Sequence, residues 1–134
     1  MCGIVGGVTN KDITPLLIEG LKRLEYRGYD SAGLIVLSDQ NSFIRERSLG
    51  KVKNLETILK NRNSKIEGNI GIAHTRWATH GEPSVNNAHP HISMNSVSLV
   101  HNGIIENYME LKNSQLKNGY LFTSDTDTEV IAHA

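Results

Sequence analysis

The spacing of apolar residues along the chain predicts short strands alternating with amphipathic helices. Short apolar runs bounded by glycine or polar residues are typical of strands in a packed sheet. On this pattern we expect strands over residues 3–8, 32–38, 42–48, 70–74, 96–100 and 120–122. The first strand is expected to be buried. The second and third form a hairpin, and the third is expected to face water because it carries Arg45, Glu46 and Arg47.

Leucines at helical spacing predict helices that cover this sheet. Leu17, Leu21 and Leu24 lie on one face of a helix that Asp12 is expected to cap and Gly28 to end. Further helices are expected over residues 52–59, 107–118 and 124–134. The mixture of strands and helices indicates an α/β or α+β layered domain over residues 1–134.

The last two predicted helices differ in how they end. Leu111 and Leu116 are expected to point inward from the helix over 107–118, which Gly119 stops in a left-handed conformation. Thr126 and Glu129 have the spacing of a capping box at the start of the final helix. No glycine, asparagine or proline ends that helix, so we expect a domain that is incomplete at its C-terminus.

Composition and charge narrow the class of protein. The 14 basic residues balance the 14 acidic ones, which argues against electrostatic capture of nucleic acid or of an acidic membrane surface. A single cysteine excludes an internal disulfide framework and a cysteine-built zinc site, and it fits a reducing compartment. No apolar run approaches membrane-spanning length. We therefore expect a cytoplasmic protein without nucleic-acid or membrane partners.

The single cysteine, Cys2, directly follows Met1. If Met1 is removed, Cys2 carries a thiol and a free α-amine on one carbon. Because α-amines titrate near pH 8, such an amine can take the thiol proton, and no catalytic histidine is required. The alternative is that Cys2 merely opens a strand as a small apolar residue. Glycines at 3, 6 and 7 weaken this alternative, since glycine within a strand often marks a close backbone approach.

Three segments with functional side chains lie where predicted strands or loops end, at residues 74–81, 101–103 and 125–129. Arg76 can bind a carboxylate through two parallel hydrogen bonds, and Asp127 can hold an ammonium group. Together they would bind an α-amino acid. The alternatives are a surface salt bridge for Arg76 and, for Asp127, a favourable charge at a helix N-terminus.

The Asn102-Gly103 pair allows two interpretations. Asn-Gly is the commonest two-residue hairpin turn, but an amide side chain followed by a glycine N–H also supplies two neutral donors for an oxyanion. A thiol that attacks an amide needs such donors. A metal site is a weaker alternative, because His89-Pro90-His91 lacks the helical spacing of known histidine motifs and its proline indicates a turn. We expect no metal and no cofactor.

Five segments together resemble a known family. They read CGIVG at 2–6, YRGYDSAG at 26–33, HTRWATHG at 74–81, HNGIIEN at 101–107 and TDTE at 126–129. In combination they resemble the N-terminal glutaminase domain, a class II glutamine amidotransferase, of the glutamine–fructose-6-phosphate aminotransferases (isomerizing), or glucosamine-6-phosphate synthases. The second and third segments look more like this family than like the related amidophosphoribosyltransferases. The resemblance implies an α+β N-terminal-nucleophile (Ntn) hydrolase, a four-layer αββα sandwich.

The resemblance also implies a role for each site residue. Cys2 would be the nucleophile, and Asn102 with the Gly103 N–H would form the oxyanion hole. Arg76 and Asp127 would hold the glutamine α-carboxylate and α-ammonium groups. The loop that closes over glutamine would include Trp77, Thr79 and His80.

The family passes the released ammonia to a C-terminal sugar isomerase domain, which is absent from residues 1–134. There fructose 6-phosphate becomes glucosamine 6-phosphate, and we expect the full-length enzyme to be a homo-oligomer. Three alternatives stay open: the glutaminase domain of another amidotransferase, an amino-acid-binding module without turnover, and a metal-dependent amidohydrolase.

Overall fold

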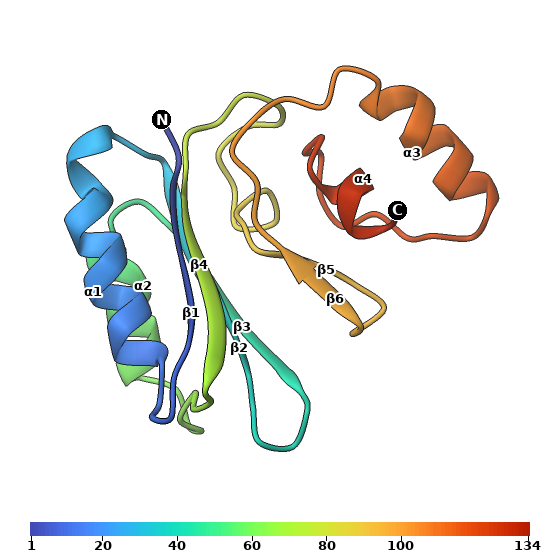
Figure 1. Cartoon of the computed structure of the whole chain (residues 1–134). Coiled ribbons are helices and arrows are strands. Elements are labelled where there is room, and N and C mark those ends of the chain that lie inside the picture. The colour runs from blue at the N-terminus through green and yellow to red at the C-terminus, as the bar shows by residue number, and fades with distance from the viewer.

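The structure, a computed structural model that describes residues 1–134, contains a four-stranded antiparallel sheet in the order β1–β4–β2–β3 (Figure 1). Its strands are β1 (Gly3–Val8), β2 (Ser31–Leu37), β3 (Phe43–Leu49) and β4 (Ile70–Arg76). In the register, Gly3 lies opposite Thr75, and Arg76 lies opposite Ser31. The start of β1 and the end of β4 therefore lie side by side at one end of the sheet. This places Cys2 beside the segment after Arg76.

Two helices, α1 (Thr14–Leu24) and α2 (Val52–Lys60), cover one face of this sheet. A 3₁₀ turn over Glu25–Arg27 extends α1 as far as Gly28, which has a positive φ of 74°. The hydrophobic core lies between these helices and the sheet. It consists of Ile13, Leu17, Ile18, Leu21, Ala32, Leu34, Val36, Val52, Leu55, Ile66 and Ala73. The apolar spacing therefore predicted both helices, and the predicted face of α1 is confirmed by the buried Leu17 and Leu21.

The other face of the sheet is covered by the second part of the chain. Strands β5 (His91–Ser93) and β6 (Val97–Leu99) form a two-stranded sheet, and α3 (Tyr108–Lys117) and α4 (Glu129–Ala132) lie beyond it. The order of layers is thus helices, sheet, sheet, helices. None of the helices is long and apolar enough to cross a membrane.

The hairpin β2–β3 and strand β1 were predicted within one residue of their bounds, but their environments differ from expectation. Strand β1 is an edge strand with Ile4 and Val8 exposed, so the prediction that it is buried was wrong. Strand β3 does not simply face water, because the side chains of Arg45 and Arg47 donate hydrogen bonds to the carbonyls of Pro90 and Ala88. This burial lowers the pKa of Arg47 to about 10.

The helix starts also differ in detail. Asp12 accepts hydrogen bonds from the backbone N–H and hydroxyl of Thr14 (3.1 and 2.9 Å), so it anchors α1, although Ile13 is the cap residue. The capping box of Thr126 and Glu129 does not form. The Glu129 carboxylate instead accepts hydrogen bonds from the backbone of Thr123 and Ser124, and α4 has only four residues.

Three further predictions in the second half were wrong. Strand β5 forms around His91, where the sequence pattern predicted a turn. Residues 120–122 are not a strand, and Leu121 is 81% exposed. In α3 the inward side chain is Gln115, which donates to the Val130 carbonyl (2.9 Å), whereas Leu116 is exposed. Gly119 ends this helix with a positive φ, as predicted.

Candidate active site

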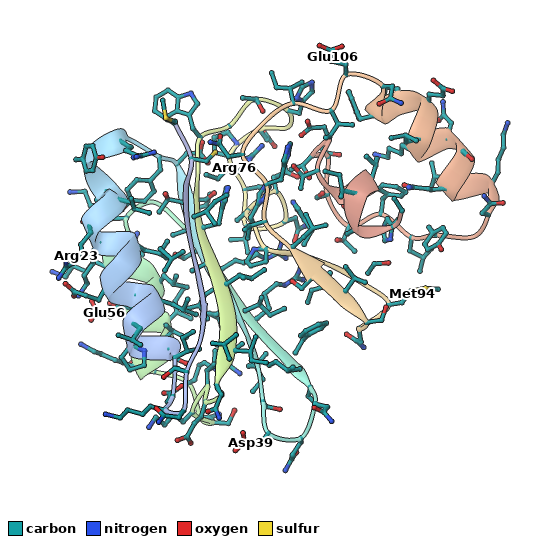
Figure 2. The ribbon with its side chains drawn as sticks, viewed as in Figure 1. Arg23, Asp39, Glu56, Arg76, Met94 and Glu106 are labelled. Carbon is teal, nitrogen blue, oxygen red and sulfur yellow. The ribbon has the colours of Figure 1, made fainter.

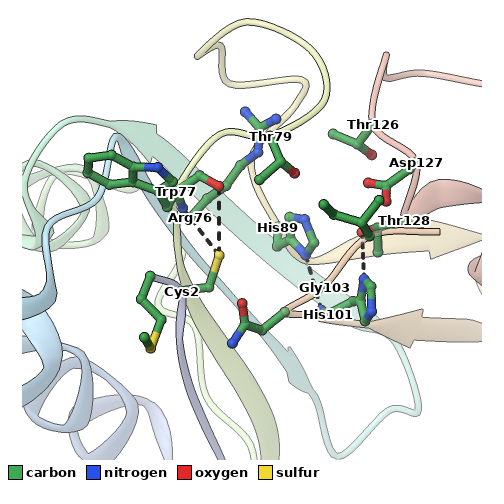
Figure 3. Close-up of a pocket in the computed structure, with 13 residues that line it drawn as sticks. Cys2, Arg76, Trp77, Thr79, His89, His101, Gly103, Thr126, Asp127 and Thr128 are labelled. Carbon is green, nitrogen blue, oxygen red and sulfur yellow. Dashed lines mark hydrogen bonds between the residues drawn. The ribbon is translucent and has the colours of Figure 1, made fainter. Parts of the chain in front are cut away.

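A cavity of about 250 Å³ lies where the start of β1 and the end of β4 face the second half of the chain (Figure 3). The residues that line it come from both halves: Met1, Cys2, Arg76, Trp77, Thr79, His89, His101, Asn102, Gly103, Ile104, Thr126, Asp127 and Thr128. Every site residue predicted from the sequence is among them except His80. Side chains separated by as much as 127 positions, those of Met1 and Thr128, therefore share one cavity.

Cys2 is half-buried at the edge of the sheet, and its sulfur faces the start of the 77–81 loop. The Trp77 N–H donates to Cys2 Sγ at 3.2 Å, which orients the sulfur toward this loop. The Gly3 N–H donates to Thr75 Oγ1 at 3.0 Å. A Cβ on Gly3 would lie 2.7 Å from the same oxygen, so only glycine lets β1 approach β4 this closely. The nucleophile candidate is thus held on a rigid element.

Arg76 is buried at the end of β4, between the two halves of the molecule (Figure 2). Its guanidinium donates to the backbone carbonyls of His80, Gly81 and Glu82. Asp30 lies 3.9 Å from this guanidinium and also accepts from the Ala78 N–H at 2.6 Å. Arg76 is therefore not a surface salt bridge. It folds the loop after β4 back over the cavity and leaves a positive charge in the cavity wall.

Asp127 lines the cavity on the side of the second half and is 3% exposed. Its carboxylate accepts from the Ile105 N–H at 2.6 Å and makes no capping hydrogen bond to α4. His80 Nδ1 lies 3.9 Å from the same carboxylate, so His80 belongs to the second layer around the cavity. Because Arg76 and Asp127 carry opposite charges in one cavity wall, the cavity is complementary to a zwitterion.

Asn102 and Gly103 follow β6 and do not form a hairpin turn. A type I′ turn needs positive φ at both central residues, and neither residue has one. The turn between β5 and β6 instead uses Met94 and Asn95, with φ of 50° and 53°. The hairpin interpretation was therefore wrong. The Asn102-Gly103 segment pairs with no strand and lines the same cavity as Cys2.

Several residues around the cavity were not assigned a role from the sequence. Asp30 is part of the segment at 26–33 that carries the family resemblance, and this was the only signal that pointed to it. Thr126, Thr128, His89 and His101 line the cavity as well. His101 Nδ1 lies 3.2 Å from Thr128 Oγ1, which ties the segment around Asn102 to the segment around Asp127. No group of three or more His, Cys, Asp or Glu side chains is arranged to hold a metal ion.

Comparisons with known proteins agree with this fold. A family model described as a glutamine amidotransferase domain matches residues 59–134, more than half of the chain. The chain is 64% identical to the glutamine–fructose-6-phosphate aminotransferase (isomerizing) of Acinetobacter baylyi and 58% identical to that of Buchnera aphidicola. Each match covers 99% of this chain but only 21 to 22% of the relative. The chain thus spans about a fifth of the length of these relatives.

Two solved structures share the fold. The glutamine phosphoribosylpyrophosphate amidotransferase from B. subtilis superposes with a TM-score of 0.71 and 29% identity over 98% of this chain and 28% of that chain. A structure described as the allosteric regulatory enzyme of purine biosynthesis gives a TM-score of 0.76 and 30% identity, over 98% and 29% of the two chains. The chain has the Ntn amidotransferase fold and belongs to the glutamine amidotransferase domain family.

Proposed function

We propose that residues 1–134 belong to the glutaminase domain of a glutamine–fructose-6-phosphate aminotransferase, with Cys2 as the nucleophile. One observation carries this proposal. The Cys2 thiol, the opposite charges of Arg76 and Asp127, and the unpaired Asn102-Gly103 segment line a single cavity. A thiol, two charged groups for an amino acid and donors for an oxyanion are the parts that amide hydrolysis of glutamine requires.

Glutamine binds with its α-carboxylate at Arg76 and its α-ammonium at Asp127. The guanidinium keeps its loop contacts and presents its remaining donors to the carboxylate. Trp77, Thr79 and His80 belong to the loop that these contacts fold over the cavity, so the loop excludes water once glutamine is bound. The side-chain amide then reaches toward Cys2.

The reaction begins when the α-amine of Cys2, exposed by removal of Met1, takes the thiol proton. The sulfur attacks the amide carbon, and Asn102 with the Gly103 N–H stabilises the oxyanion that forms. The C–N bond breaks as the Cys2 ammonium protonates the leaving nitrogen, which yields ammonia and a γ-glutamyl thioester. Water, deprotonated by the same amine, hydrolyses the thioester through the same oxyanion site to glutamate and free thiol.

The released ammonia is the nitrogen donor for fructose 6-phosphate, the acceptor in the enzymes named above. That step takes place at an isomerase domain outside residues 1–134 and gives glucosamine 6-phosphate. We place residues 1–134 in an incomplete class II amidotransferase domain of a cytoplasmic enzyme that acts as a homo-oligomer. The single cysteine and the resemblance support this assignment.

Met1 lines the cavity beside Cys2, and while it is attached the Cys2 nitrogen is an amide without a basic lone pair. The test is therefore to prepare the full-length protein with Met1 removed, with Met1 retained behind a cleavable extension, and as Cys2→Ala, with intact mass to identify each form. We expect glutamate release only from the processed protein and, after cleavage, from the extended one.

Glutamine binding to the Cys2→Ala protein, measured by calorimetry, separates catalysis from binding. We expect this variant to bind glutamine without hydrolysing it. Comparable turnover with Met1 retained would contradict the N-terminal nucleophile mechanism. A processed protein that binds glutamine but never releases glutamate would instead be an amino-acid-binding module.

A further inference from the structure

Three buried histidines form a stack behind the Asn102-Gly103 segment, and the mechanism above does not use them. His74 lies on β4, His91 is the first residue of β5, and His89 lies two residues before it; all three are at most 4% exposed. The rings of His74 and His89 are 4.1 Å apart and nearly parallel, and those of His89 and His91 are 4.6 Å apart. The stack runs from the four-stranded sheet to the two-stranded sheet.

Two members of this stack bind the backbone of His101 on both sides of its α-carbon. His74 Nε2 lies 3.1 Å from the His101 carbonyl oxygen, and the His101 N–H points to His89 Nδ1 at 3.3 Å. A carbonyl can only accept, so His74 carries its proton on Nε2. An N–H can only donate, so His89 Nδ1 has a lone pair and its proton is also on Nε2. The backbone contacts thus specify one tautomer for each ring.

The residue that is held in this way precedes the proposed oxyanion donors directly. The carbonyl bound by His74 belongs to the peptide group that joins His101 to Asn102. The next residue is confined as well, because a Cβ on Gly103 would lie 2.7 Å from the His101 ring. His74 itself lies opposite Ile4 in the sheet, two residues from Cys2 along β1. One rigid strand therefore relates the nucleophile to the oxyanion donors.

We propose that His74 and His89 are positioning residues that fix Asn102 and Gly103 against Cys2 by holding the backbone of His101 as neutral Nε2–H imidazoles. The role rests on the glutaminase function proposed above. His74 does not line the cavity and acts through His101; His89 does line it, and its positioning role also runs through the His101 backbone. A shift of about 1 Å in a catalytic group can cost roughly 10²-fold in rate, so a backbone that carries two donors benefits from being held at both ends.

The electrostatic surroundings agree with neutral rings. Burial lowers the pKa of His74 to about 4 and that of His91 to about 3, and it lowers the pKa of His89 still further. The cationic side chains around the stack, Arg76 beside His74 and Arg45 and Arg47 beside His91, act in the same direction. Protonation of His89 would place a hydrogen on Nδ1, which now has a lone pair, and would break its bond to the His101 N–H.

The kinetic test compares His74→Gln with His74→Leu in the full-length protein with Met1 removed. The glutamine amide places an N–H donor near the position of Nε2, whereas leucine fills the space without a donor. We expect His74→Leu to lower the glutaminase kcat by about 10- to 100-fold with a KM change of less than about threefold. His74→Gln should recover most of the loss. Equal kcat in the two variants, or a rise in KM alone, overturns the proposal.

A double variant shows whether His74 acts through the oxyanion site. In an Asn102→Ala background, adding His74→Leu should lower kcat much less than His74→Leu does alone, because the donor that His74 positions is already gone. Full additivity overturns the proposal. His133→Leu is a matched control: His133 is also buried, at 7% exposure in the second half, and bonds to Ser93, but it makes no hydrogen bond to His101. This control should lower stability without the same loss of kcat.

A spectroscopic test keeps the proposal separate from the glutaminase function and from the folding of variants. Ring ¹⁵N chemical shifts of the unsubstituted protein should show Nε2–H tautomers for His74 and His89, and the His101 amide should exchange slowly with solvent. An Nδ1–H tautomer at His89 or a rapidly exchanging His101 amide overturns the positioning role. If both signatures are present but the processed protein does not hydrolyse glutamine, only the proposed function fails.

Discussion

The two halves of the chain bury their side chains by different means. Residues 1–76 supply the whole apolar core cluster between the helices and the four-stranded sheet. Residues 77–134 bury only four apolar side chains, namely Ala88, Pro90, Val130 and Ala132. The buried side chains of the second half are otherwise polar or charged: Asn87, His89, His91, Ser93, Gln115, Ser124, Thr126, Asp127, Thr128, Glu129 and His133. Apolar packing holds the first half, and directional hydrogen bonds hold the second.

This difference matters for function because hydrogen bonds specify orientation more strictly than apolar contacts do. Glu129 shows how the second half satisfies buried charge: its carboxylate accepts from the backbone of Thr123 and Ser124 and from the Ser124 hydroxyl. Asn87 donates to the Glu82 carbonyl and accepts from the Asp125 N–H. The first half is thus a packed platform for Cys2, and the second half is a polar network that orients the groups facing it.

The largest effect on stability is expected from the first half. Leu55→Ala removes a fully buried side chain from the core between α2 and the sheet. We expect the free energy of unfolding to fall by about 2 to 5 kcal/mol, because both the transfer of the leucine and the cavity left behind count against the fold. Denaturant unfolding followed by circular dichroism measures the change.

The matched control is Ile58→Ala on the same helix, where the side chain is 38% exposed. It should cost clearly less than Leu55→Ala, since part of its surface already contacts water. If the two variants lose the same stability, the packing described for the first half is wrong. A loss of less than about 1 kcal/mol for Leu55→Ala would also contradict that packing.

The contrast between the halves also explains which elements the sequence predicted. In the first half, apolar periodicity located α1, α2 and the β2–β3 hairpin within about two residues, because burial there follows apolar spacing. In the second half the apolar pattern located β6 and α3 within one residue of their bounds, but it missed β5 and predicted a strand at residues 120–122 that does not form. Strand β5 begins at a histidine that is buried through hydrogen bonds, which no hydropathy pattern indicates. Residues 120–122 have strand-like composition but no neighbouring strand to pair with.

The cavity residues were predicted from chemistry and resemblance rather than from periodicity. The sequence alone drew attention to the reactive thiol of Cys2, the charges of Arg76 and Asp127, and the neutral amide donor of Asn102. The residues that hold these side chains in place were not predicted, because such a role depends on contacts that the sequence does not show. The bonds of Asp30 to the Ala78 N–H, and of His74 to the His101 carbonyl, depend on strand register and loop return, which only the structure supplies.

The second half should be the more acid-sensitive of the two. In this half His91 is neutral in the fold with a pKa of about 3, and burial also lowers the pKa of His89, whereas an unfolded histidine titrates near 6.5. Below pH 6.5 the unfolded chain therefore binds protons that the folded chain does not, so stability falls as pH falls. Each buried histidine contributes a loss of up to about 1.4 kcal/mol per pH unit, down to its folded pKa.

Hydrogen exchange at pH 7.5 and at pH 5.5 measures where this loss appears. Amides of residues 77–134 should lose protection before those of the core residues between 13 and 73. The slope of the unfolding free energy against pH is then compared between His91→Gln and the unsubstituted protein. The difference reports His91 alone, because the carboxylates titrate in both proteins. An unchanged slope between pH 6.5 and pH 5 would contradict the buried neutral state of His91.

The smallest effect is expected where the two halves meet, at Arg76. Arg76→Lys keeps the positive charge but loses the planar group that bonds the carbonyls of residues 80–82 and, in the proposed function, the glutamine carboxylate. One ammonium cannot serve both, so we expect glutamine binding to weaken by about 1 to 3 kcal/mol, seen as a higher KM. Arg62→Lys is the control, because Arg62 pairs with Glu46 away from the cavity and should leave KM unchanged. An unchanged KM in Arg76→Lys would show that Arg76 holds the loop but does not bind glutamine. A rise in KM, together with faster proteolysis of the 77–82 segment, would show that one side chain both folds the loop and binds the substrate.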